Sequence, residues 1–186
     1  MIRINQELLN FFSRLSESSA SGLVKEIRYF SKDKIVTQGK YVSSIYIIKS
    51  GVVKCYVNED NGRDFIQEFF STGEILGELE VFNDIISFCN AEAITEVTGY
   101  QIDVKDFYTL LENHPELNIL LLKALANKVR DTAIRASQQQ SYPIAYNLKK
   151  LMKFSSDEAM AFSKQDIADY LGITLRSLNR ALHEIS

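Results

Sequence analysis

Three side chains near the end of the chain are of the types that read base edges in DNA. Arg176 and Arg180 are four residues apart, and Asn179 directly precedes Arg180. Residues three and four apart share one face of a helix. An Arg side chain can donate two hydrogen bonds to guanine, and Asn can pair with adenine, through the major groove. In a helix, these three side chains would form a DNA-reading face.

Neighbouring polar side chains are suited to the DNA backbone. Thr174 and Ser177 lie where the N-terminus of the same helix is expected, and helix N-termini bind phosphate oxygens. Lys164 adds a positive charge on the preceding helix, and Leu175 shares the outer face with the Arg residues. The expected DNA-contacting residues are Lys164, Thr174, Leu175, Arg176, Ser177, Asn179 and Arg180.

The surrounding segment, FSKQDIADYLGITLRSLNRALHEIS, predicts two short helices joined by a tight turn. Ser163, followed three residues later by Asp166, is a capping signature for a helix over residues 164–171. Gly172 closes that helix and Thr174 caps the next one. Two helices joined in this way form a helix-turn-helix. The other interpretation is a small helical subdomain with a solvated charged face, and we favour the first.

The two cysteines, Cys55 and Cys89, are the other candidates for chemistry. A thiol pair can act as a redox switch. Both residues lie in apolar, strand-like runs (VVKCYV and ISFCNA), where a buried inert thiol is usual, so we favour the inert interpretation. Two thiols are too few for a four-cysteine zinc or iron–sulfur site, and we expect no metal and no cofactor.

Composition argues against an enzyme and against a membrane protein. A metal-dependent enzyme of the cupin type needs clustered His and carboxylate ligands, and residues 1–115 contain a single His, His114. No apolar run approaches the roughly 20 residues that span a bilayer. The opening MIRINQELLNFF lacks the pattern of a signal peptide. We therefore expect a cytoplasmic protein that is not an enzyme and has no membrane partner.

Charge divides the chain into two parts. Residues 1–115 hold 11 basic and 17 acidic residues, for a formal charge of −6, whereas residues 116–186 hold 10 and 7, for +3. The acidic part is predicted to begin with a helix over about residues 4–19. Short strands are predicted to follow, with turn signals at Gly39, Gly51, Gly62 and Gly73. Asn61-Gly62 is a hairpin signal, because both positions tolerate positive φ. This spacing predicts a β-sandwich, jelly roll or barrel. The strand-like runs are KEIRYF, KIVT, IYIIKS, VVKCYV, DFIQEFF, AEAITE and GYQIDV.

A long helix is predicted to follow Pro115 and to run to about Gln140. One stripe, which contains Leu117, Leu121, Ala124 and Leu125, is expected to lie on the β module. A second stripe has heptad spacing, which is typical of a coiled-coil seam. Packing within the chain is the alternative, and we favour self-association. The seam residues are Ile119, Leu122, Ala126, Val129, Ala133 and Ala136.

The order of these parts resembles the cyclic-AMP receptor protein / fumarate–nitrate regulator (CRP/FNR) superfamily of bacterial transcription factors. The resemblance rests on QGKYVSSIYIIKSGVVKCYV, FFSTGEILGELEVF and QDIADYLGITLRSLNRAL, and covers nearly the whole chain. It implies an α+β fold with a double-stranded β-roll (1–115), a central dimerisation helix (116–140) and a winged helix-turn-helix (141–186). The wing would follow the last helix, so we expect this chain to lack it.

The resemblance also implies an effector pocket in the β-roll. Its residues would be Gly77, Glu78, Leu79, Ser87, Phe88 and Thr132. Members that bind cyclic AMP hold its phosphate with an Arg-Ser pair, where this chain has Ser87-Phe88, and usually carry Gly at the position of Glu80. No Arg or Lys occurs between Arg63 and Lys105. A buried phosphate without a cation is unfavourable. We expect cyclic AMP not to bind and leave the effector unknown.

The leading hypothesis is a transcriptional regulator that binds a palindromic operator as a homodimer, with RNA polymerase as a further partner. The alternative is a dimeric β-roll sensor that acts through a protein or small-molecule partner and carries a degenerate DNA-binding domain. Arg176, Asn179 and Arg180 on the outer face of the last helix favour the hypothesis of a transcriptional regulator. The operator, and the choice between activation and repression, stay open.

Overall fold

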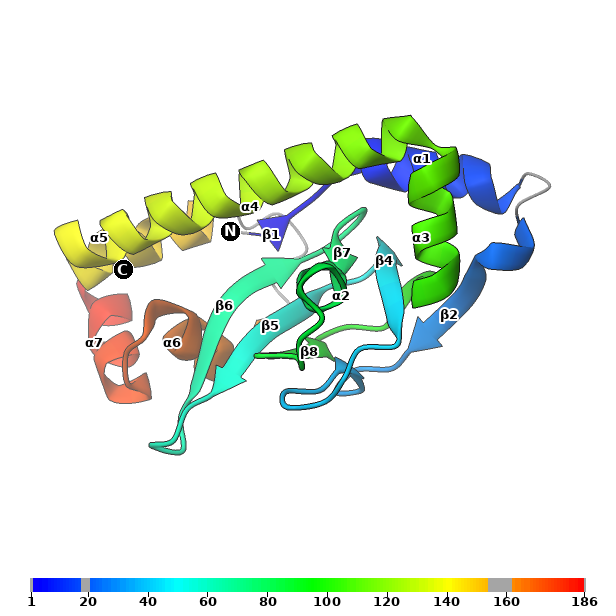
Figure 1. Cartoon of the computed structure of the whole chain (residues 1–186). Coiled ribbons are helices and arrows are strands. Elements are labelled where there is room, and N and C mark those ends of the chain that lie inside the picture. Colours follow the sequence, from blue (N-terminus) through cyan, green and yellow to red (C-terminus); the bar gives the residue numbers. More distant parts are fainter. Residues whose placement is uncertain (1, 18–20, 154–161, 186) are drawn as a thin grey trace.

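The computed structural model describes residues 2–17, 21–153 and 162–185. A two-sheet β-roll forms the N-terminal part, and the helix α4 runs along one side of the molecule above it (Figure 1). Three shorter helices gather at the far end of α4, next to the strand β6. This arrangement confirms the predicted α+β fold, with a β-roll, a long helix and a terminal helical part.

The larger sheet has five strands in the order β1-β6-β5-β8-β3. All of its pairs are antiparallel except β1 with β6, which is parallel. Its strands are β1 (Ile2–Arg3), β6 (Asp64–Phe70), β5 (Val53–Asn58), β8 (Asn90–Ala93) and β3 (Lys34–Val36). A cluster of buried apolar side chains that includes Ile48, Val53 and Val97 joins this sheet to the second one.

The second sheet has four antiparallel strands in the order β2-β9-β4-β7. These are β2 (Lys25–Tyr29), β9 (Val97–Asp103), β4 (Ser44–Ser50) and β7 (Ile75–Leu76). The other side of this sheet packs against helices through a second core that includes Ile45, Ile102 and Phe107. The predicted strand runs are all present, and the two short strands β1 and β7 were not predicted.

The predicted Asn61-Gly62 hairpin is present between β5 and β6. Gly62 has φ +76°, whereas Asn61 is not among the positive-φ residues. Residues 59–63 form the loop, which is closed by a hydrogen bond from Glu59 N to the carbonyl oxygen of Arg63 (2.9 Å). In such a longer loop only one residue needs the left-handed conformation.

The helices of the N-terminal part cover the second sheet. α1 is shorter than the predicted 4–19, because the side chain of Asn5 caps it by accepting a hydrogen bond from Leu8 N (3.1 Å). The helices are α1 (Gln6–Ser16), the 3-10 turn η1 (Ser21–Leu23), α2 (Glu78–Asn83), α3 (Val104–Asn113) and α4 (Pro115–Ser141). No helix among the described residues is long and apolar enough to cross a membrane.

The two predicted stripes of α4 have different environments. Leu117, Leu121 and Ala124 are buried, and the first two belong to the core over the second sheet. The heptad seam lies on the other side of the helix and is exposed, with Ile119 56%, Leu122 62% and Val129 72% exposed. The inner stripe is therefore confirmed, and the seam has no partner within the described part of this chain.

The terminal helices are α5 (Ile144–Lys153), α6 (Lys164–Leu171) and α7 (Leu175–Ile185). They share a small core that contains Leu148, Ala168, Leu178 and Ala181. The helix α6 also packs against β6 through the aromatic side chains of Phe69, Phe162 and Tyr170. This contact between the helix-turn-helix and the β-roll was not predicted from the sequence.

Candidate functional site

The turn between α6 and α7 has the local geometry of a helix-turn-helix. Ser163 Oγ accepts a hydrogen bond from Asp166 N (3.0 Å), and Asp166 Oδ2 accepts one from Ser163 N (3.1 Å), which completes the predicted capping box. Gly172 closes α6 with φ +67°, a conformation that costs glycine little. Ala168 is fully buried and belongs to the small core that holds α6 and α7 together.

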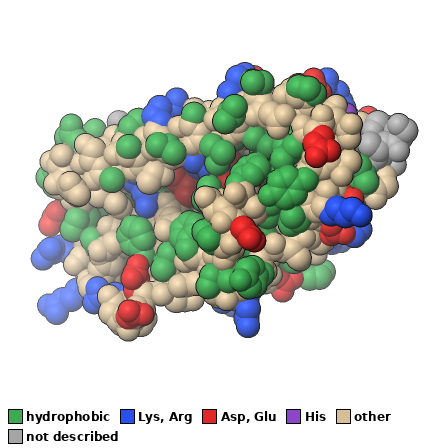
Figure 2. Space-filling model, viewed as in Figure 1, with side chains coloured by type: hydrophobic (Ala, Val, Ile, Leu, Met, Phe, Trp, Pro, Cys, Tyr) green, Lys and Arg blue, Asp and Glu red, His purple; other side chains and the backbone are tan. Residues whose placement is uncertain are grey.

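The outer face of α7 presents the predicted base-reading side chains to solvent. Arg176, Asn179 and Arg180 are exposed, whereas Leu178 and Ala181 on the inner face are buried. Lys164 is also exposed, and its Nζ lies 3.5 Å from Asn179 Oδ1. Blue side chains project from the end of the molecule that carries α7, at the lower left of Figure 2. Lys164, Arg176 and Arg180 therefore present positive charge to solvent on this face.

The two hydroxyl residues at the start of α7 bond to each other. Thr174 Oγ1 accepts a hydrogen bond from Ser177 N (3.2 Å) and lies 3.1 Å from Ser177 Oγ. Thr174 thus caps α7, as predicted, and remains exposed, while Ser177 is half-buried. Leu175 is 40% exposed beside them. A phosphate contact by either hydroxyl would have to share or replace this mutual contact.

A cavity of about 410 Å³ lies between the larger sheet, α2 and α4. Of the predicted pocket residues, it is lined by Gly77, Glu78, Leu79, Phe88 and Thr132. Gly77 has φ +92°, and a Cβ atom there would lie 2.9 Å from Val42 Cγ1, so glycine is needed to turn the chain into α2. Ser87 is not among the lining residues: it is buried and donates a hydrogen bond to Glu80 Oε1 (2.7 Å).

Three cations reach this cavity, although the sequence between Arg63 and Lys105 contains none. Arg3 comes from β1, and Lys128 and Arg135 come from α4. The expectation of a cavity without cations was therefore wrong, because distant segments complete it. Lys128 and Arg135 lie four residues before and three residues after Thr132, hence on one helix face. That spacing was a signal that could have revealed them.

Comparison with known proteins agrees with this architecture. Residues 26–114 match the family model of the cyclic nucleotide-binding domain. The regulatory protein YeiL of Escherichia coli O157:H7 is 25% identical over 151 residues, which cover 81% of this chain and 69% of YeiL. A CRP-like cAMP-activated global transcriptional regulator of Mycobacterium tuberculosis is 22% identical over 94% of this chain and 84% of its own.

Solved structures show the same fold. A transcriptional regulator of the CRP/FNR family from Eubacterium rectale superimposes with a TM-score of 0.78 at 15% identity, covering 94% of this chain and 87% of that one. These matches support membership of the CRP/FNR superfamily of transcriptional regulators, to which the chain is similar over most of its length.

Two of the three cations of this pocket are already paired with carboxylates. Lys128 Nζ lies 2.6 Å from Glu78 Oε1 and 2.9 Å from the carbonyl oxygen of Ile75. Arg3 forms ion pairs with Asp131 (2.8 Å) and Glu74 (3.5 Å). Burial raises the pKa of Glu74, while Lys128 and Arg3 act in the opposite direction. The carboxylates thus neutralise both cations inside the cavity.

Arg135 connects the pocket to the helix-turn-helix. Its guanidinium donates hydrogen bonds to the carbonyl oxygens of Ile66 (3.2 Å) and Gln67 on β6. Arg135 Cζ lies 5.5 Å from the ring centroid of Phe65 and 4.9 Å from that of Tyr170, which belongs to α6. Arg135 therefore contacts the pocket, β6 and the first helix of the DNA-binding part.

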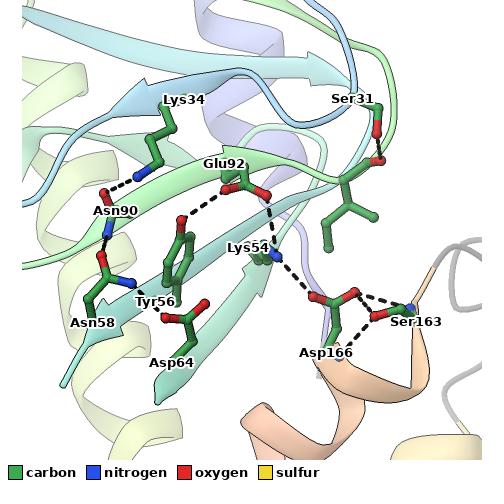
Figure 3. Close-up of polar contacts among 11 residues, drawn as sticks. Ser31, Lys34, Lys54, Tyr56, Asn58, Asp64, Asn90, Glu92, Ser163 and Asp166 are labelled. Carbon is green, nitrogen blue, oxygen red and sulfur yellow. Dashed lines mark hydrogen bonds and ion pairs between the residues drawn. The ribbon is translucent and has the colours of Figure 1, made fainter. Parts of the chain in front are cut away.

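An ion pair in the first turn of α6 ties the same two parts together (Figure 3). Lys54 on β5 lies between Glu92 on β8 (3.3 Å) and Asp166 on α6 (3.0 Å). Tyr56 holds Glu92 in place by donating a hydrogen bond to its Oε2 atom (2.9 Å). The helix-turn-helix is thus docked on the larger sheet by charge as well as by aromatic packing.

The two thiols also meet in this pocket. Cys55 and Cys89 both line the cavity, and Cys55 Sγ donates a hydrogen bond to Cys89 Sγ at 3.0 Å. Both residues are buried and both are free cysteines. That hydrogen bond and burial raise the pKa of the Cys55 thiol. Burial agrees with the sequence prediction, but the direct contact between two residues 34 positions apart was not foreseen.

Proposed function

We propose that this protein is a homodimeric DNA-binding transcriptional regulator that reads a two-fold symmetric site through α7. The observation that carries the proposal is the exposed set of Arg176, Asn179 and Arg180 on a helix whose other face is anchored in the core. Lys164, Thr174, Leu175 and Ser177 would contact the DNA backbone and flanking bases.

The exposed seam of α4 supports the homodimer. Large apolar side chains at Ile119, Leu122 and Val129 face solvent in a heptad arrangement. Ala126, Ala133 and Ala136 continue the seam with small side chains, which allow two helices to approach closely. A second copy of the same helix satisfies this pattern, because a two-fold axis places the same seam on both sides.

The cavity is the proposed effector pocket, and we infer that it does not bind cyclic AMP. A phosphate would have to displace Glu78 from Lys128 or Asp131 from Arg3 before it gained a cation. Breaking such a buried ion pair leaves an uncompensated charge. Arg135 is committed to main-chain carbonyl oxygens and aromatic rings.

The proposal keeps the division into an effector domain (1–115), a dimerisation helix (116–140) and a DNA-binding domain (141–186). It places the protein in the cytoplasm, with RNA polymerase as the partner that receives the signal. Arg135 is the proposed connection between the domains, because one side chain touches the pocket, β6 and α6.

Selection from random double-stranded DNA tests the proposal. The full chain is incubated with the pool, and bound fragments are recovered and sequenced over several rounds. We expect an enriched palindrome whose half-sites are about 10 base pairs apart, as for a two-fold dimer on one face of the duplex. Affinity for it should fall steeply as salt is raised. A folded protein that enriches no sequence would overturn the proposal.

A further inference from the structure

The pocket wall contains a pair of thiols in direct contact. Cys55 lies on β5 and Cys89 immediately before β8, and their sulfur atoms are 3.0 Å apart. Both line the cavity of about 410 Å³ next to Lys128. A pair of thiols that face a cavity is a potential site of chemical modification, and the proposed DNA-binding function does not use it.

The strand register allows the two sulfur atoms to come closer. Cys55 pairs with Ala91, so Cys89 is its diagonal neighbour on the same face of the sheet. Cys89 lies outside β8, where its main chain is not held by the strand ladder. A disulfide bond is about 2 Å long, so the sulfur atoms need to approach by about 1 Å.

The surroundings distinguish the two thiols. Cys55 is the hydrogen-bond donor and retains its proton, and this bond together with burial raises its pKa. The ammonium group of Lys128 favours the thiolate form of Cys55 and so partly offsets these effects, whereas Glu80 adds to them. Because these effects disfavour the thiolate of Cys55, we assign Cys89 as the attacking sulfur.

We propose that Cys55 and Cys89 form a hydroperoxide-sensitive dithiol that is oxidised to a disulfide across the pocket wall. Cys89 sulfur attacks one oxygen of the peroxide, the O–O bond breaks, and the alcohol or water that leaves takes the thiol proton. Cys55 sulfur then attacks the resulting sulfenic acid; the S–S bond forms, the S–O bond breaks, and water leaves with the Cys55 proton. The dithiol is oxidised by two electrons and the peroxide is reduced.

The expected consequence is a change in the pocket that reaches the DNA-binding part. A disulfide would tie the segment that follows α2 to β5, and β5 carries Lys54, the ion-pair partner of Asp166 on α6. Oxidation thus acts on the proposed effector pocket and adds a redox input to the proposed function. The chemistry at the sulfurs does not depend on DNA binding.

Exposure of the reduced full-length protein to hydrogen peroxide tests the chemistry. The chain contains two Cys residues, so thiol counting after unfolding reports on this pair alone. We expect the count to fall from two to none, with a mass loss of two hydrogens, no linked chains on a non-reducing gel, and recovery with dithiothreitol. Persistence of both thiols, oxygen adducts or linked chains would each overturn the proposal.

Two matched variants test the order of attack. Cys55→Ser keeps Cys89 and should stop at a sulfenic acid that a cyclic 1,3-diketone traps. Cys89→Ser keeps Cys55 and should react about tenfold more slowly, because burial still disfavours the Cys55 thiolate after the hydrogen bond to Cys89 is lost. Equal rates would contradict the assignment of Cys89 as the attacking sulfur. The wild-type experiment stands even if one variant does not fold.

DNA binding separates this inference from the proposed function. Affinity for the selected palindrome is measured for the reduced, oxidised and re-reduced protein, with the double Ser variant as the control. We expect oxidation to change affinity at least about threefold, reversibly, and only in the wild type. A disulfide that forms without this change would overturn the redox input but not the proposed function. Failure to bind DNA in every state would overturn the proposed function and leave the disulfide chemistry standing.

Discussion

Lys54 Nζ lies 3.0 Å from Asp166 Oδ1, and this ion pair joins the β-roll to the first helix of the helix-turn-helix. Asp166 has two functions, because its other carboxylate oxygen completes the capping box with Ser163. The side chains of Lys54 and Asp166 are 19% and 12% exposed, so water screens the pair only partly. Burial lowers the pKa of Lys54, and the hydrogen bond and charges of Asp166 and Glu92 outweigh it, so the net pKa is raised.

Lys54→Met should destabilise the protein by about 1–3 kcal/mol, because Asp166 and Glu92 would lose a shared cation in a partly buried place. The control is Lys49→Met. The Lys49–Glu26 pair has side chains 46% and 70% exposed, and loss of such a pair should cost about 0–1 kcal/mol. Urea unfolding of both variants gives the comparison. Equal losses would mean that the Lys54–Asp166 pair contributes no more than a surface pair.

Glu74→Gln should change how stability depends on pH. Burial raises the pKa of Glu74 above its ordinary value of 4.5, so the folded state holds the carboxyl proton more tightly than the unfolded state does. The resulting stabilisation is fully present below the unfolded pKa and is lost as the pH rises through the raised folded pKa. The free energy of unfolding of Glu74→Gln, minus that of the wild type, should therefore increase as the pH rises above 4.5.

Urea unfolding at a series of pH values measures this difference. Glu26→Gln is the control, since the Glu26 side chain is 70% exposed and its substitution should give a nearly flat difference over the same range. If the difference for Glu74→Gln stays constant or decreases with pH, the ion pairs with Arg3 and Lys128 affect the pKa of Glu74 at least as strongly as burial does.

Local sequence signals predicted the helices and strands, whereas side-chain contacts between distant segments could not be predicted from the sequence. The capping box at Ser163, the Gly172 turn and the buried stripe from Leu117 each depend on residues within a few positions of one another. Lys128 reaches Glu78 across 50 positions, and Arg3 reaches Asp131 across 128. Nothing in either local sequence specifies those partners, because side-chain pairing over such separations is set by the packing of α4 on the β-roll. The packing of α6 on β6 was not predicted for the same reason.

Ala133→Glu should dissociate the proposed dimer, because the two-fold axis would bring like charges together across the seam. The control is Asn127→Glu, which adds the same charge at an exposed position of α4 that lies off the seam. Light scattering at micromolar concentration measures the mass of each variant. If Ala133→Glu remains as dimeric as the control, the seam assignment is wrong.

Cyclic AMP should give no measurable binding heat in calorimetry at micromolar protein. The reason is that Glu78 already neutralises Lys128 at 2.6 Å and Asp131 neutralises Arg3 at 2.8 Å. Saturable micromolar binding would contradict this and would mean that the ligand can displace a carboxylate. Repeating the titration with Glu78→Gln then identifies the cation, since release of Lys128 should strengthen any binding that depends on it.

Arg180→Ala and Lys164→Ala should weaken DNA binding in different ways. Arg180 is exposed on the outer face of α7, and its loss should cost about 1–3 kcal/mol on the selected palindrome and relax the base preference there. Lys164 is expected to contact phosphate, so its loss should weaken all sequences alike and make the salt slope shallower by about one unit.

Both variants are measured on the palindrome and on a scrambled duplex at two salt concentrations. Circular dichroism first establishes that each variant keeps its helices, because a loss of helix stability would lower affinity for both duplexes together. Lys164 Nζ also lies 3.5 Å from Asn179 Oδ1, so Lys164→Met, which keeps most of the side-chain volume, serves as a second phosphate-contact variant. Equal losses on both duplexes for Arg180→Ala would remove this residue from base reading and leave α7 with only a backbone-binding role.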